Sequence, residues 1–255
     1  MVELNKIYHQ DCIEGLKMVS DKSIDMILCD LPYGTTNCKW DTVIDLASLW
    51  AEYERIIKDT GAIVLFAQTP FDKLLGSSNL KLLRYEWIWE KPAATGHLNA
   101  KKMPMKAHEN ILVFYKKLPV YNPQKTKGHK PVNSFTKRVE IQNKSEIYNR
   151  QSSEVSGGGS TERYPRSVLQ FSSDKQRSNL HPTQKPVALC EYLIKTYTNE
   201  GDIVLDNCMG SGTTAEASIR LNRNFIGFET EAHYVEVANE RLKSVIRGSS
   251  LKEVV

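Results

Sequence analysis

Residues 24–34 read Ile-Asp-Met-Ile-Leu-Cys-Asp-Leu-Pro-Tyr-Gly, and this stretch decides the fold class. The apolar run 26–29 has the composition of a strand buried in a parallel sheet. It ends at Asp30, and a tight turn follows in which Pro32 fixes its own φ and keeps Leu31 extended. Ligands of open α/β sheets bind beyond the carboxyl ends of the strands. The stretch therefore brings an acid and the ring of Tyr33 to that rim, where they can hold a planar heterocycle by an edge and a face. On these residues alone, an ordinary strand-to-loop turn with a capping Asp fits equally well.

A second strand that ends on an acid lies near the C-terminus. Residues 203–206 end at Asp206, and 207–214 follow as Asn-Cys-Met-Gly-Ser-Gly-Thr-Thr. A helix over 215–221 and a strand over 225–228, closed by Glu229, complete a βαβ unit. Gly210 and Gly212 allow close backbone approach, and the helix N-terminus offers free amides. Glu229 stands where an acid can chelate ribose hydroxyls, so we predict a nucleoside site.

Two other nucleotide-binding patterns compete for this unit. A P-loop requires a lysine where Thr213 stands. A dinucleotide fold requires a third small residue, which Ala215 supplies, so the glycines do not exclude NAD. The Asp-Leu-Pro-Tyr corner, however, has no evident task in hydride transfer.

Length and composition fit one α/β domain with an inserted region. The chain has 255 residues, a formal charge of +4 and a pI near 8.7, which mildly favours a polyanionic partner. Its five cysteines are scattered and form no Cys-x-x-Cys, so we expect no disulfide framework, no metal site and a reducing cytosol. The first residues do not resemble a signal peptide, and no apolar run approaches a membrane span.

Hydrophobic spacing predicts the remaining elements. Helices are expected over 13–19, 46–58 (ended by 59–61), 71–83, 187–197 and 232–245, and strands over 7–8, 62–66, 85–91 and 111–115. Trp87 and Trp89 are assigned to the core, and Trp40 to anchoring a loop. Between 116 and 175 this periodicity disappears, and basic residues with interleaved aromatics dominate. Such a region is a recognition module, a disordered loop or a solvated surface excursion.

Together these pieces resemble the amino-methyltransferases that modify exocyclic nitrogens of DNA bases. Residues 30–33 look like that family's Asp-Pro-Pro-Tyr signature, and 206–214 look like its cofactor loop. The order of catalytic half, insertion and cofactor half resembles the β group, as do the segments 108–114, 164–169 and 181–186. The resemblance covers nearly the whole chain except the middle of the insertion, and 30–41 is similar to methylases of phages and mobile elements.

The resemblance implies a Rossmann-like sheet of about seven mostly parallel strands with helices on both faces. The catalytic domain would span 1–117 and 179–255, and 118–178 would be an inserted target-recognition region. The enzyme would use S-adenosyl-L-methionine on double-stranded DNA in the cytoplasm. A homodimer and a cognate restriction endonuclease are candidate partners that the sequence leaves open.

The resemblance also implies roles for single residues. The catalytic set would be Asp30, Leu31, Pro32 and Tyr33: the Tyr33 ring stacks on a flipped-out base, while the Asp30 carboxylate and the Leu31 carbonyl accept hydrogen bonds from its amino group. The cofactor would contact Asp11, Cys12, Asp30, Thr183, Gln184, Lys185, Asn207, Gly210, Ser211, Gly212, Thr213, Thr214 and Glu229. Phosphates and bases of DNA would contact Lys125, Lys127, Lys130, Lys137, Arg138, Arg163 and Arg166. Cys29 precedes the acid and is assigned to buried packing, and His181 to capping the next helix.

Two positions depart from the family pattern. Leu31 replaces the first proline of the signature, which leaves the backbone carbonyl in place, and Asn207-Cys208 replaces the common Pro-Phe. Asp at the head of the signature favours N6 of adenine over N4 of cytosine, where Ser is commoner. Relatives that modify RNA or protein glutamine usually carry Asn at this place. A catalytically inactive DNA-binding regulator is the alternative from a different class.

Overall fold

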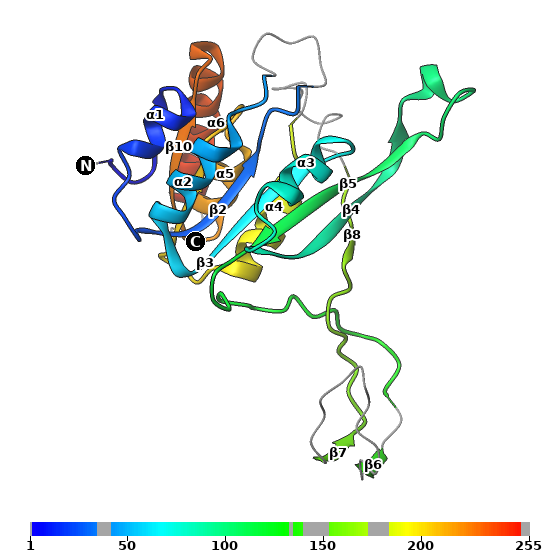
Figure 1. Ribbon diagram of the computed structural model, residues 1–255. Helices are drawn as coiled ribbons and strands as arrows, with labels where there is room; N and C mark the ends of the chain where they lie inside the picture. Colours follow the sequence, from blue (N-terminus) through cyan, green and yellow to red (C-terminus); the bar gives the residue numbers. More distant parts are fainter. Residues whose placement is uncertain (1, 35–41, 133–134, 140–152, 173–183, 251–255) are drawn as a thin grey trace. The chain divides into compact units, whose positions relative to one another are not determined.

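The computed structural model describes residues 2–34, 42–132, 135–139, 153–172 and 184–250. The chain divides into two compact units, Met1–Asn122 with Ser167–Val255, and Pro123–Arg166. The strands of the larger unit are β1 (Lys6–His9), β2 (Ile24–Asp30), β3 (Ile57–Ala67), β4 (Leu83–Thr95), β5 (Lys106–Phe114), β8 (Val168–Gln170), β9 (Ile203–Asp206) and β10 (Asn224–Glu229). They form one eight-stranded sheet in the order β1-β10-β9-β2-β3-β5-β4-β8 (Figure 1).

The sheet is mostly parallel, as predicted. Neighbours from β1 through β10, β9 and β2 to β3 are parallel, whereas β5 is antiparallel to both β3 and β4. The eighth strand exceeds the predicted count of about seven. It is β8, three residues at the sheet edge paired with β4, and it lies in the part of the chain where hydrophobic periodicity had disappeared.

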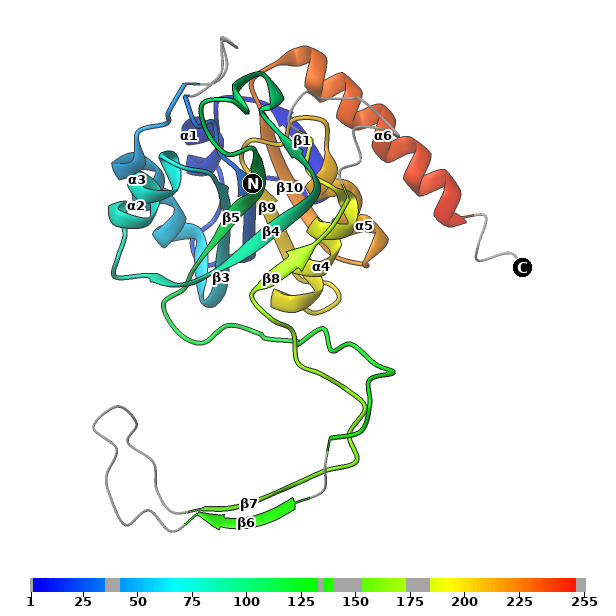
Figure 2. The same cartoon turned by 90° about the vertical axis from the view of Figure 1, so that its right-hand side faces the viewer.

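Helices cover both faces of the sheet. They are α1 (Cys12–Lys17), α2 (Leu46–Ile56), α3 (Phe71–Ser78), α4 (Val187–Tyr197), α5 (Thr213–Arg220) and α6 (Ala232–Ser250), with a 3-10 turn η1 (His97–Asn99). Figure 2 shows α1, α2 and α3 on one side of the sheet and α4 and α5 on the other. The central strand β2 is buried on both faces because Ile27 packs into the core beneath α1–α3, whereas Leu28 packs into the core beneath α4. Trp87 and Trp89 are buried in that second core, which confirms their assignment.

Two predicted helices, those over 46–58 and 71–83, give way to strands inside the ranges that their periodicity indicated. The helix expected over 46–58 ends at Ile56, because Ile57 adopts an extended conformation and pairs with Ile24 as the start of β3. Residues 59–61, predicted to end the helix, therefore lie inside β3. The helix expected over 71–83 ends at Ser78, where the Asn79 side chain accepts a hydrogen bond from the Leu82 amide at 3.3 Å and turns the chain into β4.

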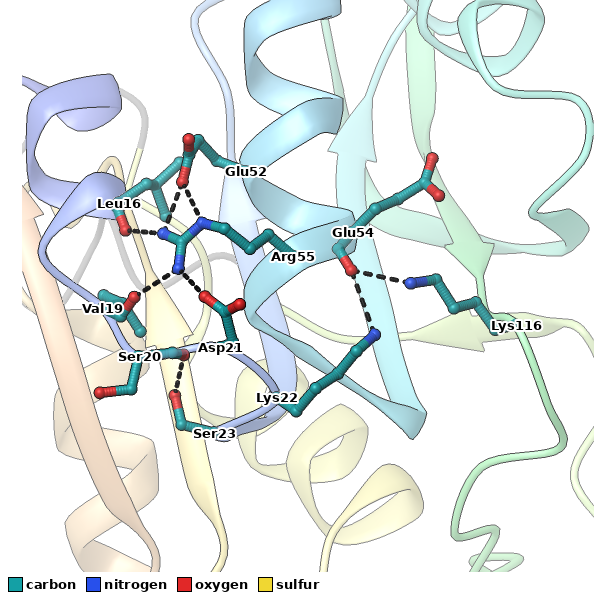
Figure 3. Close-up of polar contacts among 10 residues, drawn as sticks. All are labelled: Leu16, Val19, Ser20, Asp21, Lys22, Ser23, Glu52, Glu54, Arg55 and Lys116. Carbon is teal, nitrogen blue, oxygen red and sulfur yellow. Dashed lines mark hydrogen bonds and ion pairs between the residues drawn. The ribbon is translucent and has the colours of Figure 1, made fainter.

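Arg55 fixes the connection that leads into β2. Figure 3 shows its guanidinium donating to the carbonyls of Leu16 and Val19, at 2.9 and 2.7 Å, and to the Asp21 carboxylate at 2.6 Å. Nearby, Lys22 and Lys116 both donate to the carbonyl of Glu54. These contacts tie the connection between α1 and β2 to α2.

The smaller unit contains a two-stranded antiparallel ribbon, β6 (Phe135–Val139) with β7 (Ser153–Gly157). Thr126 and Arg163 pair as an isolated antiparallel bridge in the same unit. This unit lies within the predicted insertion 118–178. Within the described ranges, none of the helices in either unit has the length and apolar character needed to cross a membrane.

Candidate active site

A pocket of about 710 Å³ is lined by the acids that end or follow four parallel strands. Asp11 follows β1, Asp30 ends β2, Asp206 ends β9, and Glu229 ends β10. The carboxyl ends of parallel strands meet at one edge of a sheet, so two motifs that are far apart in the sequence share one cavity. The structure thereby brings together the two sites that the sequence suggested separately.

Asp30 is held by two side chains. The Tyr33 hydroxyl donates to its Oδ1 at 2.6 Å, and Lys185 Nζ forms an ion pair with its Oδ2. Burial raises the pKa of the Asp30 carboxyl, and the Lys185 ammonium opposes this rise without cancelling it. Burial alone would lower the pKa of Lys185, but the neighbouring carboxylates outweigh it and the pKa is raised. Lys185 therefore stays charged and favours the ionised form of Asp30.

Lys185 also faces a second buried acid that sequence reasoning did not assign to the site. Its Nζ lies 3.5 Å from Glu109 Oε2, and Lys91 Nζ lies 2.5 Å from Glu109 Oε1. Burial would raise the pKa of Glu109, but the two lysines together lower it. The four side chains Lys91, Glu109, Lys185 and Asp30 thus form a chain of alternating charge along the pocket wall.

The turn after β2 presents the predicted aromatic ring. Tyr33 lines the pocket, and Phe71 stacks on it with ring centroids 5.1 Å apart, which fixes the plane of the tyrosine ring. Burial, together with the nearby Asp30 charge, raises the pKa of Tyr33 well above its ordinary value, so the hydroxyl remains a donor. Leu31 and Pro32 line the same pocket, and the Leu31 side chain is buried. Cys29 is buried in the core, as predicted.

The glycine loop after β9 is tied to Glu229. The Gly210 amide donates to Glu229 Oε2 at 2.7 Å, and the Glu231 amide donates to Oε1 at 2.9 Å. Thr230 Oγ1 also donates to Oε1, at 3.5 Å. Each carboxylate oxygen accepts up to two hydrogen bonds, so Oε2 retains capacity for a ligand hydroxyl. Burial raises the pKa of Asp206 to about 6, although a hydrogen bond from Thr214 opposes the rise.

The glycine loop contacts α6. Gly212 has φ +81°, and a Cβ there would stand 2.9 Å from the Cβ of Ala238. Gly212 does not line the pocket. Its role in the described structure is to let the loop and α6 approach closely. Arg241 donates to the Ser211 carbonyl at 3.1 Å and to Thr213 Oγ1 at 3.2 Å, while it pairs with the buried Glu216.

The structure places most of the other predicted cofactor residues on the pocket wall. Asp11 caps α1 by accepting from the amides of Ile13 and Glu14, at 2.9 and 3.2 Å. Gln184 is buried, and its Nε2 has no hydrogen-bond partner. The other predicted residues that line the pocket are Cys12, Asn207, Gly210, Ser211, Thr213 and Thr214. Thr183 and His181 lie outside the described residues.

The predicted DNA-contacting residues differ in how free they are. Lys127 and Lys130 are exposed, although Lys127 Nζ lies 3.8 Å from Glu162 Oε1. Arg166 is exposed at the end of the smaller unit. Arg163 is committed to structure, since its guanidinium donates to the backbone carbonyls of Ser160 and Lys130. Lys125 pairs with Glu162 at 3.3 Å and lies over the Tyr164 ring. The side chains of Lys137 and Arg138, on β6, are outside the described part of the structure.

Sequence reasoning missed several pocket residues besides Glu109 and Lys91. Glu109 comes near the start of an apolar strand, and only the antiparallel direction of β5 brings it to the rim. A strand-initial acid is a weak signal without the sheet order. Further lining residues that were not predicted are Ile44, Phe66, Gln68, Trp89, Met209, Thr230 and Tyr234.

Comparison with known proteins agrees with this geometry. Residues 24–240 match a family model described as DNA methylase. The chain belongs to this DNA methylase family, whose members modify N6 of adenine or N4 of cytosine. The methylase is 31% identical to the type II methyltransferase M.HpaI of Haemophilus parainfluenzae, over 93% of this chain and 74% of that protein.

Two further relatives match over most of their length. The DNA adenine methyltransferase YhdJ of Escherichia coli is 29% identical over 94% of the methylase and 83% of its own length. The crystal structure of the M1.HpyAVI–SAM complex superposes with a TM-score of 0.62 at 28% identity, covering 92% of the methylase and 98% of that chain. These matches confirm the fold class and the family.

S-adenosylmethionine is the cofactor of this family, and the pocket fits it chemically. The Gln184 Nε2 donor is buried without a protein partner, a group that requires a ligand or water to satisfy it. Oε2 of Glu229 accepts one hydrogen bond and has capacity left for a ribose hydroxyl. Gln184, Glu229 and Lys185 all line the pocket, so these partners face one cavity.

Proposed function

We propose that the methylase transfers a methyl group to N6 of adenine in double-stranded DNA, with the target base flipped out of the duplex. The observation that carries this proposal is the Asp30 carboxylate, held at the pocket wall by Tyr33 and Lys185 beside the turn that contains Leu31. In the family that the sequence resembles, a carboxylate at the position of Asp30 favours adenine over cytosine as the target base. One relative, YhdJ, is named as a DNA adenine methyltransferase. A base inside a duplex hides its amino group, which is why flipping is part of the proposal.

Asp30 and Leu31 would activate the amino group. When bound, S-adenosylmethionine supplies the methyl group. The nitrogen of an exocyclic amino group is a poor nucleophile because its lone pair is delocalised into the ring. The Asp30 carboxylate and the Leu31 carbonyl would accept hydrogen bonds from the two N–H groups of this amino nitrogen. These hydrogen bonds favour a tetrahedral nitrogen and stabilise the positive charge that develops on it. Fixed acceptors of this kind contribute about 3 to 4 kcal/mol each to barrier lowering.

Tyr33 would position the base. Phe71 supports one face of the Tyr33 ring, and the Tyr33 hydroxyl is anchored on Asp30, so the ring and the carboxylate hold a fixed relation. The base would stack on the ring while its amino edge meets Asp30. The proposed cofactor contacts are Glu229 with the ribose, Asp11 near the adenine moiety, and 210–214 with Gln184 and Lys185 around the methionine part.

The finer biological assignments are also proposals. The exposed lysines of the smaller unit, Lys127 and Lys130, would bind phosphates of the target duplex. The methylase would act in the cytoplasm, as a homodimer or beside a cognate restriction endonuclease. N4 of cytosine is the second candidate acceptor, because the family modifies both bases.

The test compares Asp30→Asn with Asp59→Asn, an exposed acid paired with Lys22 and Lys117 outside the pocket. Asp30→Asn should lower methyl transfer to mixed-sequence duplex DNA by at least about a hundredfold. Binding of S-adenosylmethionine, followed by calorimetry, should remain within a few-fold of the unmutated protein. Equal transfer by the two variants would refute the role given to Asp30.

A further inference from the structure

The strands β4 and β5 continue past the sheet as a hairpin that neither the sequence motifs nor the pocket account for. Figure 1 shows this hairpin projecting from the sheet in the green part of the chain. Thr95 pairs with Lys106, and η1 forms the tip between them. The hairpin starts at the pocket, since Ala93 and Thr95 both line its wall.

Backbone hydrogen bonds within the tip hold its conformation, but its large side chains are exposed. The amides of Asn99 and Ala100 donate to the carbonyls of Gly96 and His97, at 3.0 and 3.1 Å, and the Lys102 amide donates to the Asn99 carbonyl at 2.8 Å. Leu98 is nevertheless 87% exposed, Met103 is 55% exposed and Met105 is 41% exposed. Apolar side chains held out on a fixed turn indicate a contact surface.

The positive charge of the hairpin indicates what kind of partner it binds. Residues 92–108 contain Lys101, Lys102 and Lys106 and no acidic residue, so this short segment carries +3 in a chain whose net charge is +4. Among the described residues, none of these three lysines forms an ion pair; Lys106 Nζ contacts Gln68 Oε1 at 3.4 Å. Lysine is depleted in protein–protein interfaces, whereas a duplex presents one phosphate per about 1.7 Å of its axis.

We propose that this hairpin, residues 95–106, is a DNA-contacting element separate from the smaller unit, in which the three lysines bind phosphates beside the target base and Leu98 packs against the bases. The inference rests on the proposed action on DNA. A base that enters the pocket comes from a duplex lying over the pocket mouth, and the hairpin rises from the pocket wall. Proteins that deform duplexes use exposed leucines as wedges between base steps, and Leu98 has that exposure at the tip.

The first test is salt-dependent binding of a labelled mixed-sequence duplex, followed by fluorescence anisotropy between about 50 and 200 mM NaCl. The variant Lys101→Ala/Lys102→Ala/Lys106→Ala is compared with Lys81→Ala/Lys117→Ala/Lys195→Ala. These three control lysines are exposed: Lys81 precedes β4 and Lys117 follows β5, at the ends of these strands opposite to the hairpin, and Lys195 lies in the last turn of α4. Each phosphate contact contributes about 0.9 to the slope of log K against log salt. The hairpin variant should bind more weakly with a slope shallower by roughly 2 to 3, and the control should keep the original slope.

If the hairpin variant matches the control in affinity and slope, the inference about the hairpin is wrong, but the proposed methylation of DNA is unaffected. If the unmutated protein binds no duplex, both the inference and the proposed function are wrong, so the two failures can be told apart.

The proposed role of Leu98 as a wedge is tested by comparing Leu98→Ala with Leu80→Ala; Leu80 is 68% exposed and lies just before β4. Leu98→Ala should weaken binding without altering the slope. If it instead shifts the sedimentation coefficient and leaves DNA affinity unchanged, Leu98 contacts a second copy of the chain and the proposal is wrong.

Discussion

Replacing Lys185 with methionine tests the charge chain that surrounds Asp30. The Lys185 side chain is 9% exposed and pairs with two acids, Asp30 and Glu109. At the 3.5 Å that separates Lys185 from Glu109, the Coulomb energy is about 5 kcal/mol with an effective dielectric constant of about 20. Part of that energy offsets the cost of burying the ammonium. Removing one partner of a buried pair costs about 3 to 5 kcal/mol, and we expect a loss of unfolding free energy in that range at neutral pH.

The loss should depend on pH in a defined direction. Burial already raises the pKa of Asp30, so protonation of this carboxyl favours the folded state and its contribution to stability falls as the pH rises through that pKa. Without Lys185 the pKa of Asp30 rises further. For Glu109, whose pKa is lowered by Lys185 and Lys91, removal of Lys185 acts in the same direction, and Lys91 compensates in part. Lys185→Met should therefore be destabilised more at pH 8 than at pH 5.

The assay is denaturant unfolding at both pH values, together with the pH profile of single-turnover methyl transfer. Because the ionised form of Asp30 is the acceptor, the acid limb of that profile should move to higher pH in the variant. The matched control is Lys17→Met, which removes a pair with Glu14 at 2.7 Å whose side chains are 54% and 57% exposed. An exposed pair of this kind contributes little to stability, because water screens both charges. Equal destabilisation of the two variants, or an unmoved acid limb, would refute the reasoning.

Three further predictions concern the cofactor loop. Gly212→Ala should lose about 1 kcal/mol more unfolding free energy than Gly201→Ala. The two glycines have nearly the same φ, +81° and +83°, but only at Gly212 would a Cβ meet Ala238. Equal losses of unfolding free energy in denaturant titrations would contradict this, because they would mean that the loop moves away from Ala238 at no cost. The pKa of Asp206 is about 6 in the folded protein against an ordinary 3.8, so this group contributes stability that is present below pH 4 and lost as the pH rises through about 6, a change of about 3 kcal/mol. In Asp206→Asn the melting temperature should therefore depend less on pH between pH 4 and 6. An unchanged dependence of the melting temperature on pH would contradict this. Arg241→Met should lower S-adenosylmethionine affinity measured by calorimetry about tenfold, since Ser211 and Thr213 lose a common donor, whereas Arg84→Met, far from the loop, should leave it unchanged.

The parts of the site carried by contiguous motifs could be predicted from the sequence. Residues 24–34 and 203–214 each contain a strand, its terminal acid and the following turn. Local pattern therefore placed Asp30 and Asp206 correctly at strand ends and Tyr33 in the turn after β2. The parallel sheet then followed from general rules about α/β folds. The role of each residue in catalysis stays a prediction.

Features that depend on tertiary pairing could not be predicted. Glu109 reaches the pocket because β5 runs antiparallel to its neighbours, and no local signal specifies that direction. The early end of α2 depends on the pairing of Ile57 with Ile24, which overrides the helical spacing of the preceding residues. The hairpin between β4 and β5 depends on the pairing of Thr95 with Lys106, eleven positions apart and separated by residues with no alternating pattern.

The central claim is methyl transfer to N6 of adenine. The most direct measurement incubates the purified protein with methyl-labelled S-adenosylmethionine and mixed-sequence duplex DNA, digests the DNA and identifies the labelled nucleoside by mass spectrometry. The account predicts N6-methyladenosine in its deoxy form, with Asp30→Asn giving none above background. Label on N4 of cytosine without label on adenine would contradict it.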